Sequence, residues 1–152
     1  MPKKVKKPTI KEPKPKKSPT KKTKYIWAIG RRKTATARVR LFEKKGPILV
    51  NDKPIEEYFP GEINQLLSLE PFRTTNTLNK YSATIKVEGS GKNGQLGAVI
   101  HGLSRAIAAT NQEKYRSILK SRGFLTRDSR KRQKRMVGMG GKARRKKQSP
   151  KR

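Results

Sequence analysis

Positive charge is concentrated at the two ends of this 152-residue chain and limits where a hydrophobic core can form. Of the net charge of +31, residues 1–24 carry +10 and residues 120–152 carry +14. Like charges repel one another, and the few apolar residues near the carboxyl end, such as Val137, follow no helical or strand period. We therefore expect a globular domain at 25–119, a disordered basic arm rich in Lys and Pro at 1–24, and an extended tail at 120–152 that becomes ordered only against dense negative charge.

Composition excludes several classes of protein. The chain has no cysteine, so disulfide bonds, thiol chemistry and a zinc knuckle are excluded. The amino-terminal arm is charged without an apolar stretch, and no apolar run of about eighteen residues follows, so we expect a soluble protein that is not secreted. The large positive charge predicts a polyanionic partner. The arm itself is either a segment that tracks phosphates or a solubilising extension.

Alternating apolar and polar residues predict two adjoining strands. The first places Tyr25, Trp27 and Ile29 on one face, and we expect Gly30 and the basic residues 31–33 to interrupt it with a bend. The second alternates a core face with a face of hydroxyls and guanidiniums: Ala35, Ala37, Val39 and Leu41 against Thr34, Thr36, Arg38 and Arg40. Such a polar face suits hydrogen bonds to phosphates, and an ordinary solvated face has the same pattern.

The later segments predict an alternation of helices and strands. A short strand at 48–50 lies between turns, a short helix follows Gly61, a loop covers 74–79, and a further strand begins at Tyr81. Two more helices are predicted from apolar residues at helical spacing, the first by Leu96, Val99, Ile100, Leu103 and Ile107 and the second by Tyr115, Ile118 and Leu119. Glycines on the other side of the first of these two helices allow close approach of RNA or, as we favour, close packing of another element.

Residues 89–94 match the pattern G-x-G-x-x-G between a predicted strand and a helix. A dinucleotide-binding unit also needs a further parallel strand ending in an acidic residue, and too little chain follows to form one. What remains is an anion site at a helix start, plausible for an RNA phosphate. His101 has no carboxylate or thiol cluster near it in sequence, which favours a structural role.

Four blocks of sequence, in order, resemble the ribosomal protein S9 family of the small subunit. They are 30–39 (GRRKTATARV), 94–98 (GQLGA) with 101–106 (HGLSRA), 125–128 (LTRD), and 142–145 (KARR) with the terminal Lys151 and Arg152. Residues 1–24 lie outside the resemblance. The carboxyl end departs from the family pattern, since Ser149 and Pro150 stand where an aromatic residue and Ser are usual. The change removes a stacking partner and a backbone donor.

This resemblance implies an α/β domain, more fully an α+β sandwich. A mixed sheet of about four strands would carry helices, as in the second domain of ribosomal protein S5, with a left-handed βαβ crossover and extended basic tails. It also implies that the body binds 16S-type ribosomal RNA in the head of the small subunit, beside neighbouring head proteins. The tail would reach the anticodon stem-loop of the peptidyl-site tRNA.

The resemblance and the basic pattern together give a set of candidate contact residues. Those expected to bind ribosomal RNA are Arg31, Arg32, Lys33, Arg38, Arg40, Arg105, Arg127, Arg130, Lys142, Arg144 and Arg145. Those expected to bind tRNA are Lys151 and Arg152. Within the tail, Thr126 or Asp128 is expected to form a local cap with nearby backbone N–H groups.

We therefore expect a structural protein of cytoplasmic ribosomes, with an organellar ribosome as the alternative location. No catalytic activity, cofactor, metal, membrane or small-molecule substrate is expected. Two rival hypotheses are a DNA-compacting protein of linker-histone type, which the basic arm favours, and a nucleotide-dependent enzyme that uses the 89–94 loop.

Overall fold

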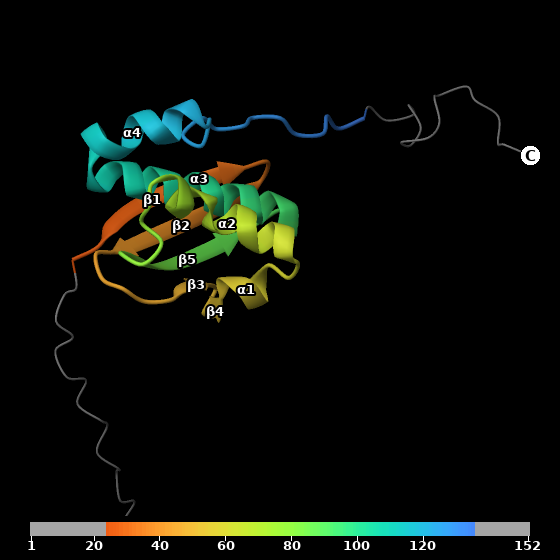
Figure 1. Cartoon of the computed structure of the whole chain (residues 1–152). Helices are drawn as coiled ribbons and strands as arrows, with labels where there is room; N and C mark the ends of the chain where they lie inside the picture. The colour runs from red at the N-terminus through yellow and green to blue at the C-terminus, as the bar shows by residue number, and fades with distance from the viewer. Residues whose placement is uncertain (1–23, 136–152) are drawn as a thin grey trace, which may run out of the picture.

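The computed structural model describes residues 24–135, which form a five-stranded mixed sheet with helices packed on one face (Figure 1). The strands lie in the order β1-β2-β5-β3-β4; β1, β2 and β5 are antiparallel neighbours, and β3 runs parallel to β5. The strands are β1 (Ile26–Arg32), β2 (Ala35–Phe42), β3 (Ile48–Val50), β4 (Lys53–Pro54) and β5 (Ser82–Glu88). The helices are α1 (Ile55–Tyr58), α2 (Glu62–Thr74), α3 (Lys92–Thr110) and α4 (Gln112–Ser121).

The expected α/β class is confirmed, with one strand more than the four anticipated. The extra strand is the two-residue β4, which follows a tight turn at Asn51 and Asp52, both with positive φ. Asn51 continues the pairing of β3, since its side chain exchanges two hydrogen bonds with the backbone of Val87. The parallel strands β3 and β5 are joined through β4, α1 and α2, which is the expected βαβ connection; its left-handed sense stays a prediction.

The helix α3 lies between the sheet and helices α2 and α4 and forms the centre of the core. It contacts β1, β2 and β5 on one side and α2 and α4 on the other (Figure 1). Its side chains are therefore buried on more than one face, including Ala98 and Val99, which have no exposed surface. The glycines beside them serve packing, as we favoured over an approach of RNA.

The predicted interruption at Gly30 is wrong, because β1 continues through it to Arg32 and the turn falls at Lys33. Gly30 instead lies where α3 crosses the strand. A Cβ atom there would overlap the Ala98 carbonyl oxygen and the Gly102 nitrogen, and it would lie 2.7 Å from the Gly102 Cα. The residue is glycine because two backbones touch at this point, and the strand keeps its extended shape.

The helix predicted after Gly61 is present as α2, but the apolar spacing that predicts it belongs to its exposed side. Its buried residues are Ser68, Pro71 and Phe72. The side chains of Ile63, Leu66 and Leu67 face solvent instead. The helical period is therefore confirmed, while the face that packs on the body is the different one that carries Ser68, Pro71 and Phe72.

Replacing Gly30 by Ala should lower the free energy of unfolding by about 3 kcal/mol or more, because the added methyl group meets backbone atoms that cannot move aside. Urea titration followed by circular dichroism measures this. The matched control is Gly91→Ala, where a Cβ has nothing within 4 Å. The control should cost less than about 1 kcal/mol, as a change at a helix N-cap, and equal losses in the two variants would contradict the packing explanation.

Candidate nucleic-acid interface

The outer edge of β1 is closed by two side chains of α3. The backbone N–H of Arg31 donates to Nδ1 of His101 at 3.1 Å, and Nη1 of Arg105 donates to the carbonyl oxygen of Ile29 at 2.6 Å. These bonds satisfy polar groups that an edge strand otherwise leaves unpaired. His101 thus has the structural role expected of it.

His101 is held in its neutral form by this arrangement. Burial lowers the pKa of the imidazole, and the positive charge of the nearby Arg105 lowers it further. A protonated ring has no lone pair with which to accept from the Arg31 N–H. The bond to β1 therefore depends on a histidine that resists protonation.

Three of the candidate RNA-binding arginines meet beside this closed edge. Arg31 and Arg127 line a hollow of about 380 Å³ together with Arg105 and His101. A second hollow of about 260 Å³ adjoins it, sharing Arg105 and Leu125 and adding Arg116. We call the two together the edge groove. Within residues 24–135 no carboxylate lines either part, so the groove is a cationic surface suited to phosphates.

The candidate residues Arg32 and Arg130 are brought together by a carboxylate of the expected tail. Nη2 of Arg32 lies 3.0 Å from Oδ2 of Asp128, and its Nη1 donates to the Arg130 carbonyl oxygen at 2.8 Å. The Arg130 side chain binds the same carboxylate at 2.8 Å, and its N–H donates to Oδ1 at 2.9 Å. The local cap expected at Asp128 is confirmed by this backbone bond. Hydrogen bonds from Arg130, supported by the charge of Arg32, hold the pKa of Asp128 well below its usual range.

These contacts correct the expectation that the chain leaves the body at residue 120. Helix α4 continues to Ser121, and Phe124 and Leu125 pack against the core after a turn at Gly123. Apolar contact and the Asp128 ion pairs together hold the first part of the basic segment on the folded body. Beyond it the chain runs away from the domain as far as the structure describes it (Figure 1).

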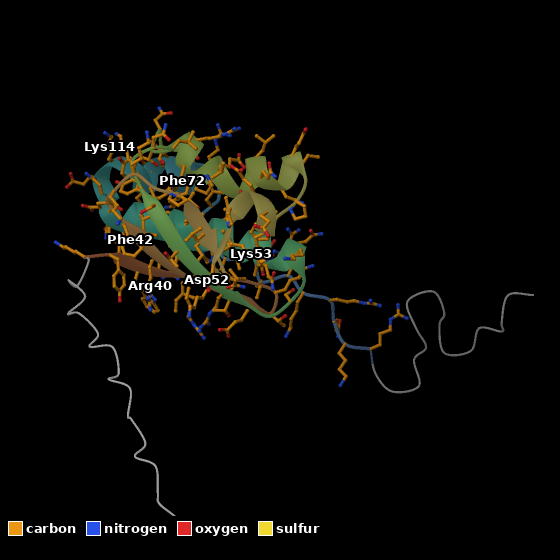
Figure 2. All side chains as sticks on the ribbon, turned by 90° about the horizontal axis from the view of Figure 1, so that it is seen from below. Arg40, Phe42, Asp52, Lys53, Phe72 and Lys114 are labelled. Carbon is orange, nitrogen blue, oxygen red and sulfur yellow. The ribbon has the colours of Figure 1, made fainter. Side chains whose placement is uncertain are left out.

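Arg38 and Arg40 lie apart from the edge groove, on the face of the sheet that no helix covers. Arg40 projects away from the buried Phe72, as Figure 2 shows, and its guanidinium lies 5.4 Å from the ring centre of Tyr25. Arg38 pairs with Glu88 at 3.0 Å. Trp27 stands opposite Arg40 in the register and is 57% exposed. A cationic face with an exposed indole suits contact with phosphates and unstacked bases.

Lys33 lies at the opposite end of β1 from Tyr25, next to the 89–94 loop. With Ser90, Lys92 and Asn93 it lines a shallow hollow of about 270 Å³ at the start of α3. After α3 the chain forms α4 rather than a further strand. The dinucleotide-binding interpretation is thereby excluded by topology as well as by length.

Sequence reasoning missed several residues that share these surfaces. Arg116 joins the edge groove through its place on α4, and Lys86 lies opposite Arg38 on the open face of the sheet. The alternation in β5 could have identified Lys86, whereas Arg116 has no sequence signal beyond its charge. The candidates Lys142, Arg144, Arg145, Lys151 and Arg152, and the arm before Lys24, lie outside the described residues.

Two further features concern the described part of the chain. None of its helices combines the length and the apolar character needed to cross a bilayer. Residues 24–135 contain no group of three or more His, Asp or Glu side chains placed to hold a metal ion.

Comparison with known proteins gives one consistent match. A family model described as Ribosomal protein S9/S16 matches residues 30–152. The chain is 47% identical over 117 residues to the small ribosomal subunit protein uS9 of Maridesulfovibrio salexigens and 45% identical over 117 residues to that of Lawsonia intracellularis; each match covers 77% of this chain and 89% of the relative. The uS9 protein of Dehalococcoides mccartyi is 44% identical over 118 residues, which cover 78% of this chain and 89% of that relative.

Stability should fall on mild acidification because of His101. Its pKa is lowered in the folded protein, so below the ordinary histidine value of about 6.5 the unfolded chain binds a proton that the folded chain does not. The free energy of unfolding, measured in urea between about pH 7 and 5, should decrease more steeply than in the His101→Asn variant, whose amide oxygen can still accept from Arg31. Parallel curves for the two proteins would contradict this assignment.

Replacing Asp128 by Asn should release the start of the tail without unfolding the domain. The Arg32 guanidinium loses its ionic partner, so trypsin should cut after Arg127 several-fold faster, while the midpoint of urea unfolding stays the same. Cleavage is followed by mass spectrometry. Asp52→Asn is the control, because Asp52 is exposed and forms no ion pair within residues 24–135. Equal cleavage rates after Arg127 in the wild type and the Asp128 variant would show that the ion pair does not hold this segment.

Proposed function

Because this chain belongs to the ribosomal protein S9 family, we propose that it is a structural component of the small ribosomal subunit that binds 16S-type ribosomal RNA in the head. The family is one of structural proteins of the ribosome and not of enzymes. The proposal includes contacts with neighbouring head proteins and a location in cytoplasmic ribosomes.

The observation that carries the RNA-binding part is the edge groove. It gathers four arginines from β1, α3, α4 and the segment after α4 around a surface without carboxylates among the described residues: Arg31, Arg105, Arg116 and Arg127. A polyanion bound there would be attracted by every one of these arginines, because no carboxylate lining the groove pairs with them. The open face of the sheet, with Arg40 and Trp27, supplies a second surface for the same partner.

The tail is proposed to reach the peptidyl-site tRNA. Its start is fixed to the body by Arg32 and Asp128, which gives the following basic segment a defined point of departure. The proposed contacts with the anticodon stem-loop are made by Lys151 and Arg152, and those with ribosomal RNA by Lys142, Arg144 and Arg145. This part rests on the family membership and on the basic sequence.

Removing charge from the edge groove should weaken binding to a ribosomal RNA fragment of the subunit head. The double variant Arg116→Gln/Arg127→Gln should reduce the slope of log K against log salt by about 1 for each phosphate that is no longer neutralised. Arg73→Gln is the matched control, because Arg73 is an exposed arginine at the end of α2, outside the groove. Filter binding across a salt series measures the slopes. Equal slopes for the wild type and the double variant would remove the groove from the interface.

The same fragment distinguishes the rival proposal of a DNA-compacting protein. Duplex DNA added as competitor should displace the RNA only in large excess, and the protein should co-sediment with small subunits after a moderate salt wash. Preference for the duplex, or loss from the subunits in that wash, would favour nonspecific binding of nucleic acid.

Deleting Lys151 and Arg152 should lower the affinity of small subunits for peptidyl-site tRNA while leaving assembly intact. The reason is that two charges at the tip are removed, whereas the body and the anchored start of the tail are unchanged. Binding of labelled tRNA to reconstituted subunits measures the effect. Unchanged tRNA affinity would exclude the tip from this interaction.

A further inference from the structure

The surface formed by α1 and α2 differs in charge from the rest of the molecule. Residues 54–72 contain four of the ten acidic residues of the chain and no Lys or Arg. Lys53 pairs with Glu57 at 3.1 Å, whereas Glu56, Glu62 and Glu70 form no ion pair within residues 24–135. In a protein with a net charge of +31, this is a local patch of the opposite sign.

The same surface exposes large apolar side chains. Ile63 is 74% exposed, Leu66 is 48% exposed and Leu67 is 39% exposed. Their spacing places them on one side of α2, away from the buried Phe72. Leu66 also lines a groove of about 300 Å³ with Glu56, Glu62 and Arg73. Exposed aliphatic side chains that lie together and are rimmed by charge mark a contact surface for protein.

The α1 part of this surface lies at the opposite edge of the sheet from the edge groove. Helix α1 directly follows β4, which is one edge strand of the sheet, whereas the edge groove lies along β1 at the other edge. Figure 1 shows α1 beside β3 and β4, toward the opposite edge of the sheet from α4. Phosphates are repelled by the carboxylates of α1 and α2, so the surface is unsuited to nucleic acid.

We propose that the face formed by Glu56, Glu62, Ile63, Leu66, Leu67 and Glu70 docks a second protein of the small subunit through an apolar patch rimmed by Lys or Arg. The aliphatic side chains of α2 would be buried against the apolar patch, and the carboxylates would pair with the basic rim. This rests on the proposed function, since it assumes that the protein is assembled in that subunit. One molecule would then hold RNA on its cationic side and protein on its acidic side.

The test uses assembled small subunits that carry a photo-crosslinking amino acid at position 63. We expect a product that survives nuclease digestion and in which mass spectrometry finds a basic, apolar segment of another subunit protein. The same probe at position 127 should give an RNA product. A crosslink from position 63 to RNA, to the arm at 1–23 of the same chain, to a second copy of the chain, or to nothing would each overturn the proposal.

Charge reversal supplies an independent measure. With the probe at position 63, Glu56→Lys/Glu62→Lys should reduce the protein crosslink at least about tenfold, which corresponds to 1.4 kcal/mol. Leu78→Ser is the control for an exposed leucine outside this face and should leave the yield unchanged. An unchanged yield in the charge-reversed variant would contradict the proposed rim. Incorporation into subunits is scored separately by sedimentation, so a failure of the proposed function is seen as loss of the protein from the subunits rather than as loss of the crosslink.

Discussion

The close approach of α3 to β1 is the constraint on which the rest of the structure depends. Gly30 and Gly102 face each other across the crossing, and a Cβ on Gly102 would lie 2.7 Å from a methyl carbon of Val39 and 3.1 Å from the Gly30 nitrogen. Only at this separation can the side chains of His101 and Arg105 reach the backbone of the edge strand. The packing of two backbones therefore also places the arginines of the edge groove.

The charged side chains lie outside this core. The strongly basic segments lie at the ends of the chain, and within the domain Arg31 lies at the β1 edge while Arg38 and Arg40 lie on the uncovered sheet face. Of the acids within residues 24–135, Asp128 and Glu88 pair with arginines, and four others lie on α1 and α2: Glu56, Glu57, Glu62 and Glu70. Separate faces of opposite charge allow a small domain to bind different classes of macromolecule without competition between them.

The sequence predicted which segments form helices and strands better than it predicted which neighbours those segments contact. Alternation in β2 and β5 identified both strands and their buried faces, because one covered face imposes a period of two. The role of Gly30 was not predictable, since its partner Gly102 lies far along the chain and only tertiary packing brings them together. The exposure of the apolar side of α2 was not predictable for the same reason, because the spacing of apolar residues does not show whether another element covers them. Among the candidate contacts, the family resemblance and the basic pattern together named Arg31, Arg105 and Arg127, but did not predict that they meet in one groove.

The ion pair between Arg32 and Asp128 also imposes an order on biosynthesis. The two residues are separated by 96 positions, so the arginine leaves the ribosomal exit tunnel long before its partner is translated. Before Asp128 itself emerges from the tunnel, β1, β2 and α3 have emerged and can assemble, so the basic segment that follows attaches last, to a surface that is finished. A nascent chain whose domain fails to fold offers no such attachment, which leaves its most basic end unrestrained and able to adhere to any RNA nearby.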